Sequence, residues 1–286
     1  MNITDNKRNL KDYPLLSGII ITVIFSVILS INEIFEVFTY FRDGGISQEV
    51  SYLIDFSVRF FSGVVVVIII IPAILYLSIR HVHLREYFHD MNFTRGFSLN
   101  PSFLAGIISA SCYFLICIVI ASALGTLWID FSIIVDLETG IGWIVFLYAL
   151  VPAIWEELTF RGAILNTVRA KYSDSIAILI SSVFFGLFHI IAFALVGDYA
   201  MAVFGFIMST LFGLTWGYTN IKCDSLLPGI VAHYVIDAFG YAFIYHSLNA
   251  EPSLVGLFFI STTILYPLIT IVLAKVFLKQ KKGHLN

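Results

Sequence analysis

Charged residues are scarce in this chain of 286 residues, where Asp, Glu, Lys and Arg together make up only 12%. A soluble domain is about a quarter charged. The 16 basic and 19 acidic residues are too few to cover a globular surface that must also hide 27 Phe and 14 Tyr. With 59% hydrophobic residues, the composition excludes a soluble enzyme and a disordered or fibrous chain. It predicts an integral membrane protein.

The chain also lacks a surplus of positive charge and a set of paired cysteines. Its net charge of −3 provides no basic field, so no nucleic-acid partner is expected. The three cysteines are odd in number and have no zinc-ligand spacing. Cys112 and Cys117 lie in an apolar stretch, where Cys behaves as a small hydrophobe. No disulfide framework is predicted.

What the sequence does contain is a succession of long apolar stretches. A helix of about 20 mostly apolar residues spans a bilayer. Eight such stretches are predicted, at residues 14–35, 57–79, 102–124, 141–163, 176–196, 200–219, 226–246 and 254–278. The predicted fold class is therefore all-α, a polytopic membrane helix bundle with about eight transmembrane helices. Residues 1–286 are expected to form a single integral membrane domain in the lipid bilayer.

Basic and acidic residues alternate between successive loops. Lys and Arg gather in both terminal tails and in the second, fourth and sixth loops. The odd-numbered loops are mostly acidic, and Arg42 and Arg59 are the only basic residues assigned to that side. Because Lys and Arg favour the cytoplasmic side of short loops, we predict a multi-pass protein of the cell membrane with both termini in the cytoplasm.

Ionisable side chains occur inside three of the predicted spans, where each costs roughly 2.5–3.5 kcal/mol and usually faces a partner or a cavity. They are Glu156, Glu157 and Arg161 in the fourth span, His189 in the fifth, and His233 and Asp237 in the seventh. Helical spacing places Arg161 one turn from Glu157, and Asp237 one turn from His233. Their compatible depths predict one polar pocket that opens toward the cytoplasm.

Each of these features taken alone also has a structural explanation. Glu157 and Arg161 could form a structural ion pair, and His189 a hydrogen bond between helices. His233 with Asp237 could be the proton relay of a transporter, although no repeated half with broken hydrophobic segments supports a transporter. Six polar groups together favour a functional site.

The same residues carry a resemblance to a family. The sequence resembles the CAAX protease and bacteriocin-processing family of intramembrane proteases, also called the Abi family. The first family motif, two glutamates, three residues and an arginine, matches Glu156 to Arg161. The second, phenylalanine-x-x-x-histidine, matches Phe185 to His189, and the third, histidine-x-x-x-asparagine or aspartate, matches His233 to Asp237. The three motifs occur in order, each on a separate predicted span.

This resemblance implies hydrolysis of a peptide bond inside the membrane, with residues 140–245 as the catalytic core. It implies that Glu156 activates a water molecule with help from His189, and that His233 and Asp237 complete the site. Supporting roles are implied for Glu157, Arg161 and Phe185, which would hold the geometry. The implied substrate is a small hydrophobic peptide or a membrane-protein tail. The alternative is a non-catalytic immunity or regulatory protein that binds a bacteriocin or another membrane partner.

The sequence leaves the role of a metal open. Amide hydrolysis requires a developing oxyanion to be stabilised by donors or by a metal, and an ionised Asp237 cannot donate. Asp237 is therefore protonated, orients His233 or helps to ligate a metal. Two histidines (His189 and His233) with Glu156 or Asp237 would suit zinc or another divalent metal, although the His-Glu-x-x-His pattern is absent.

Overall fold

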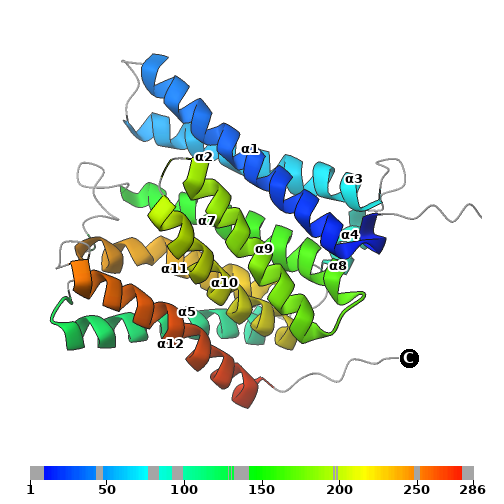
Figure 1. Ribbon diagram of the computed structural model, residues 1–286. Coiled ribbons are helices and arrows are strands. Elements are labelled where there is room, and N and C mark those ends of the chain that lie inside the picture. Colours follow the sequence, from blue (N-terminus) through cyan, green and yellow to red (C-terminus); the bar gives the residue numbers. More distant parts are fainter. Residues whose placement is uncertain are drawn as a thin grey trace, which may run out of the picture.

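The computed structural model describes residues 10–42, 48–76, 84–91, 99–127, 129, 131, 142–195, 197, 199–247 and 252–278. Every regular element within these residues is a helix (Figure 1), which confirms the predicted all-α fold class. In chain order the helices are η1 (Leu10–Asp12), α1 (Pro14–Arg42), α2 (Gln48–Val65), η2 (Val66–Ile70), α3 (Ile71–Tyr76), α4 (Leu84–Asp90), α5 (Leu99–Leu124), η4 (Gly142–Ile144), α7 (Val145–Glu156), η5 (Glu157–Ile164), α8 (Leu165–Arg169), α9 (Asp174–Leu195), α10 (Tyr199–Cys223), α11 (Leu227–Ser247) and α12 (Pro252–Phe277).

These helices make the chain a multi-pass membrane protein. Within the described residues, six helices are long and apolar enough to cross a bilayer, and two shorter apolar helices accompany them. The six are Glu49–Tyr76, Pro101–Leu124, Gly142–Arg169, Asp174–Ala194, Tyr199–Cys223 and Ser253–Phe277; the two shorter ones are Pro14–Leu29 and Leu227–Gly240. Each lies in one of the eight predicted stretches, so the predicted count of eight holds approximately.

The second span differs from its prediction. Its helix begins at Gln48 rather than near residue 57, so Arg59 lies inside the span and not in a loop on the outer side. Asp55 provides the physical reason, because its carboxylate accepts a hydrogen bond from Arg59 Nε at 2.8 Å across one helical turn. Charged residues within membrane spans usually pair in this way, because pairing lowers the cost of carrying an arginine into the bilayer.

The loop predicted over residues 80–101 contains the short helix α4. The Tyr87 hydroxyl on this helix donates to the Val67 carbonyl at 2.9 Å, and that carbonyl lies in the π-helical segment η2, between α2 and α3. Burial raises the pKa of Tyr87, so its hydroxyl remains a neutral donor. The contact fastens the loop to the second span.

The helices stack in a bundle in which the motif-bearing helices lie centrally. In Figure 1, α1 with α2 and α3 lies along one side, α5 and α12 along the opposite side, and α7, α9 and α10 between them. Contacts of α2 with α7 and of α1 with α9 join one side to the centre. Contacts of α11 with both α5 and α7 join the other. The ionisable residues are thus enclosed by the helices that carry none of the three motifs.

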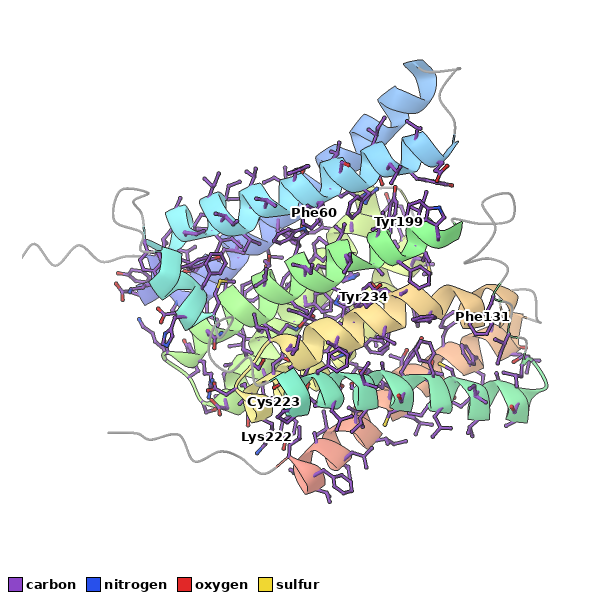
Figure 2. The ribbon with its side chains drawn as sticks, turned by 180° about the vertical axis from the view of Figure 1, so that it is seen from behind. Phe60, Phe131, Tyr199, Lys222, Cys223 and Tyr234 are labelled. Carbon is purple, nitrogen blue, oxygen red and sulfur yellow. The ribbon has the colours of Figure 1, made fainter. Side chains whose placement is uncertain are left out.

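The two ends of the bundle differ in their residues. Helix α1 begins and α12 ends at the same end (Figure 1), and Lys222 lies at that end in Figure 2, opposite Tyr199 and Phe131. Basic residues occupy helix termini on this side, namely Lys11 in η1, Arg169 in α8, Lys222 in α10 and Lys275 in α12. The charge asymmetry read from the sequence is therefore carried by one end of the folded bundle.

Helices α9 and α10 share the most extensive contact in the bundle, and Gly186 makes their approach possible. A Cβ added at Gly186 would lie 2.7 Å from the Phe206 carbonyl oxygen and 2.2 Å from Thr210 Oγ1. Small residues allow helix backbones to come this close in membranes, where packing rather than hydrophobic transfer drives helix association.

We predict that Gly186→Ala lowers the free energy of unfolding by about 1–3 kcal/mol, the usual cost of overpacking. The backbone carbonyl of Phe206 cannot move aside without separating the two helices. Unfolding of the purified protein by titration with SDS would measure the loss. The control is Gly256→Ala in α12, where an added Cβ meets nothing within 4 Å and the higher helix propensity of Ala should preserve stability. Equal stabilities of the two variants would contradict the prediction.

Candidate active site

The first motif lies where the helical geometry changes. Glu156 is the last residue of α7, and Glu157–Ile164 forms a π-helix of eight residues, all of them buried. Its hydrogen bonds run between residues five apart, which leaves carbonyl groups to be satisfied by side chains. Ser181 Oγ of α9 donates to the Phe160 carbonyl at 2.6 Å, and Asn166 Nδ2 donates to the Gly162 carbonyl at 2.8 Å. Such segments are frequent at functional sites.

Glu157 and Arg161 form the buried ion pair predicted from their spacing. Arg161 Nη1 lies 3.0 Å from Glu157 Oε1, and the two side chains are 1% and 0% exposed. The guanidinium carbon also lies 4.0 Å from the centroid of the Phe185 ring. A cation over an aromatic face is stabilised most when water is excluded. Phe185 therefore gives the second motif a direct contact with the first.

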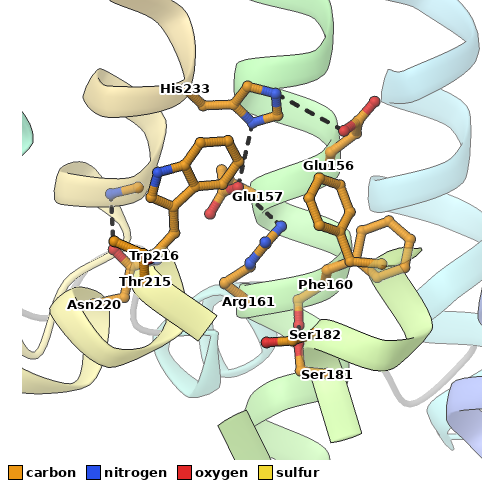
Figure 3. Close-up of polar contacts among 12 residues, drawn as sticks. Glu156, Glu157, Phe160, Arg161, Ser181, Ser182, Thr215, Trp216, Asn220 and His233 are labelled. Carbon is orange, nitrogen blue, oxygen red and sulfur yellow. Dashed lines mark hydrogen bonds and ion pairs between the residues drawn. The ribbon is translucent and has the colours of Figure 1, made fainter. Parts of the chain in front are cut away.

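His233 links the three carboxylates of the site, and Figure 3 shows its contacts with Glu156 and Glu157. Its Nδ1 lies 3.3 Å from Glu157 Oε1, and its Nε2 lies 3.3 Å from Asp237 Oδ2 and 4.0 Å from Glu156 Oε2. Carboxylate oxygens accept hydrogen bonds, so both ring nitrogens face acceptors and are placed to donate. Glu156 and Glu157, though adjacent in sequence, thus face different nitrogens of one ring.

His189 has a different environment. Its Nδ1 lies 2.9 Å from the Phe185 carbonyl oxygen. Because a carbonyl can only accept, Nδ1 carries the proton and Nε2 keeps its lone pair. The Phe185 ring packs between the two histidines, 4.7 Å from His189 and 6.2 Å from His233 between ring centroids. The structure thereby brings all three motifs together around Phe185 and His233.

Exposure divides the site into two parts. The whole π-helix is buried, whereas the Asp237 side chain is 35% exposed and His189 is half-buried. Glu156 lies between these extremes at 8%. Glu156, His189 and Asp237 are thus on the accessible side, and Glu157 with Arg161 lies behind them.

Two residues at the site carried no signal in the sequence analysis. The Trp216 ring stacks on His233 with centroids 4.3 Å apart and an interplanar angle of 25°. Asn220 Oδ1 accepts a hydrogen bond from the Gly229 amide at 2.8 Å, at the start of α11. A Cβ at Gly229 would lie 2.5 Å from Glu157 Oε2, so only glycine admits the carboxylate. Because Trp216 and Asn220 are four residues apart, the sequence could have placed both side chains on one face of a helix.

A second polar cluster connects the site to α2. Asp55 accepts hydrogen bonds from Arg59 of its own helix and from the Tyr148 hydroxyl of α7. The same hydroxyl also lies 3.1 Å from the Tyr52 carbonyl oxygen, so its one proton is shared between the two acceptors. Tyr148 precedes Glu156 by eight residues, about 12 Å along the helix axis. This cluster fixes the position of the helix that ends in Glu156.

The predicted metal ligands are not arranged as a ligand set. Among the described residues, no three His, Cys, Asp or Glu side chains gather in a group that could hold a metal ion. A metal-binding histidine must offer a bare nitrogen, and His233 directs both of its nitrogens at carboxylates. His189 alone of the two offers such a nitrogen. The zinc set of His189, His233, Glu156 and Asp237 does not fit this arrangement of side chains and stays a prediction.

Comparison with known families bears on the same segment. Residues 138–239 match the family described as Type II CAAX prenyl endopeptidase Rce1-like. The segment is similar to this family of CAAX endopeptidases. The resemblance predicted from the three motifs is confirmed, since Glu156 to Asp237 all lie within the match. The matched segment runs from η4 through α7, the π-helix η5, α8, α9 and α10 into α11, and it leaves out α1, α2, α5 and α12. No curated protein shows a significant match to the chain.

The ion pair generates a stability prediction. We expect Arg161→Met to lower the free energy of unfolding by about 3–5 kcal/mol, because it leaves the Glu157 charge buried with one partner fewer. The double variant Glu157→Gln with Arg161→Met should recover part of that loss, since neither charge then remains. Titration with SDS would measure the free energy of unfolding of Arg161→Met, of Glu157→Gln and of the double variant. A double variant that loses at least the sum of the two single losses would contradict the buried pair.

Proposed function

We propose that the chain is an intramembrane endopeptidase that cleaves a small hydrophobic peptide or a membrane-protein tail. The observation that carries the proposal is the meeting of Glu156, His233 and Asp237, of which Asp237 is 35% exposed, within a segment that matches a CAAX endopeptidase family. A charged cluster with a merely structural role would have no need for an exposed carboxylate.

In this proposal Glu156 is the general base. Its Oε2 is buried and has no hydrogen-bond partner among the described residues, and a buried polar atom of this kind is usually satisfied by water. The attacking water bonds to the scissile carbonyl carbon and gives its proton to Glu156. When the carbon–nitrogen bond breaks, the proton passes to the leaving amine. The bare Nε2 of His189 is a second acceptor that can orient this water.

His233 and Asp237 are proposed to serve the oxyanion. The Nε2–H of His233 faces Asp237 and Glu156. During the reaction it would turn from Asp237 to the developing oxyanion, where a donor lowers the barrier to amide hydrolysis. Of the three roles open to Asp237, orientation of His233 has the best support, because the carboxylate lies 3.3 Å from Nε2.

Glu157, Arg161 and Phe185 are proposed as the scaffold of this chemistry. Glu157 fixes the Nδ1 side of the His233 ring, and Arg161 balances the charge of Glu157. Phe185 supports Arg161 with its ring and His189 with its carbonyl. All three are at most 2% exposed, which suits residues that hold a site rather than bind substrate.

We also infer that both termini face the cytoplasm of a cell that carries the protein in its plasma membrane. The support is the set of basic residues at the end of the bundle where α1 begins and α12 ends, because short cytoplasmic loops are enriched in Lys and Arg. A reporter fused to either terminus would test this orientation.

The decisive variant is Glu156→Gln, which keeps the size of the side chain and removes its basicity. Loss of a general base lowers a rate by about 100- to 10,000-fold. We therefore expect that peptide termini present in membranes of cells with the wild type vanish with this variant at matched protein levels. Mass spectrometry of membrane-protein termini would compare the two. Direct cleavage would then be shown with the purified protein and the substrate so identified.

The matched control for that experiment is Glu49→Gln, which changes a carboxylate in the first turn of α2, away from the site. It should leave the termini as in the wild type. Identical termini in the wild type and Glu156→Gln, together with a retained cellular phenotype, would overturn the proteolytic function. The chain would then be a non-catalytic immunity or regulatory protein that binds a bacteriocin or membrane partner.

The role of a metal has its own test. Since only His189 offers a bare nitrogen in this arrangement, we expect cleavage by the purified protein to survive dialysis against a chelator. Metal analysis of the same sample would show whether a bound ion was removed. Loss of cleavage that zinc restores would establish a zinc requirement, and the set of His189, His233, Glu156 and Asp237 could supply the ligands only if His233 turned away from one carboxylate.

A further inference from the structure

A chain of hydrogen bonds approaches the site from the helices outside the matched segment. The Tyr266 hydroxyl of α12 accepts a hydrogen bond from Trp216 Nε1 at 2.9 Å. The same hydroxyl shares a hydrogen bond of 2.8 Å with Ser109 Oγ of α5. All three residues are at most 2% exposed. The tyrosine hydroxyl can accept a hydrogen bond from the indole and donate one to the serine at the same time, so it acts both as acceptor and as donor.

The indole held by this chain lies against the imidazole of His233. The two rings are nearly parallel, with centroids 4.3 Å apart. On its other sides the indole meets Phe212 at 5.6 Å and the Arg161 guanidinium at 5.3 Å. Trp216 is thus wedged among the side chains that surround His233, and a rotation of its plane would move the stacked ring.

The polar contacts of His233 do not by themselves define its ring plane. Both of its hydrogen-bonding distances, to Glu157 and to Asp237, are 3.3 Å, which is longer than the usual 2.7–3.2 Å. The outer torsion of a histidine side chain has broad minima. A stacked neighbour whose own plane is fixed supplies the missing constraint.

We propose that Tyr266 is a positioning residue: its hydroxyl, held by Ser109, fixes the plane of Trp216 and through it the orientation of His233. Tyr266 touches neither substrate nor reacting atoms. Ser109 and Tyr266 lie outside residues 138–239. Helices α5 and α12 would therefore help to orient His233. The structural effect is independent of the proposed function, whereas its consequence for catalysis rests on it.

The test compares Tyr266→Phe with the wild type by NMR of the purified protein. The chain has four Trp and seven His, and Trp216→Phe and His233→Gln would assign the two relevant signals. We expect the indole N–H signal of Trp216 to shift and to exchange faster with solvent, because its acceptor is gone. We also expect the ring signals of His233 to shift while those of the other histidines stay in place.

The matched control is Tyr113→Phe. Tyr113 is a buried tyrosine of α5 whose ring lies 5.5 Å from that of Tyr266. Its substitution also removes a tyrosine hydroxyl from this aromatic cluster, but it leaves the hydrogen-bond acceptor of the indole in place. It should shift neither signal. If Tyr266→Phe fails to fold, Ser109→Ala removes the far end of the chain and should shift both signals in the same direction. A shifted Trp216 signal with an unchanged His233 signal would overturn the proposal.

Activity provides a separate readout once a cleaved terminus is known. A misplacement of about 1 Å can cost about 100-fold in rate. We expect Tyr266→Phe to lower kcat by up to about 100-fold at unchanged KM, in a variant that accumulates to normal levels. If Glu156→Gln shows that the chain is no protease, the NMR comparison still decides whether Tyr266 orients His233. An unchanged kcat in a proven protease would overturn the catalytic part of the proposal.

Discussion

The rest of the structure depends on the burial of a charge. Arg161 is enclosed at 1% exposure and lies 3.0 Å from Glu157, and neither charge could remain in a bilayer without the other. Glu157 in turn faces His233, so the pair anchors the imidazole as well. Gly229 is needed because the carboxylate fills the space of a Cβ. One buried pair therefore constrains two helices, a glycine and a histidine.

The π-helix converts this constraint into a site. Glu156 ends α7 and Glu157 begins the π-helix, and their carboxylates face different nitrogens of the same ring. Ser181 and Asn166 satisfy carbonyls of the widened turn. The cost of irregular backbone in a membrane is tolerated only where protein encloses it. Full burial of the segment meets that condition. The accessible side is left to Glu156, His189 and Asp237.

The helices outside the matched segment contribute more than an enclosure. Helix α2 holds α7 through Asp55 and Tyr148, and α5 and α12 hold the indole that stacks on His233. These contacts are made by polar groups within apolar stretches, where each group must find a partner inside the protein. A polar residue in such a stretch therefore reveals that a partner exists, although not which one.

By itself the sequence determined that the chain is a helical membrane protein with about eight spans, because composition and the length of apolar runs follow directly from the thickness of a bilayer. It also determined the residues of the three motifs and the pairs one turn apart, since helical spacing is local. The tertiary structure alone decided that the second span starts at Gln48, that the first motif forms a π-helix, and that Trp216 stacks on His233. Each of these depends on partners far away in the chain, which no local pattern encodes.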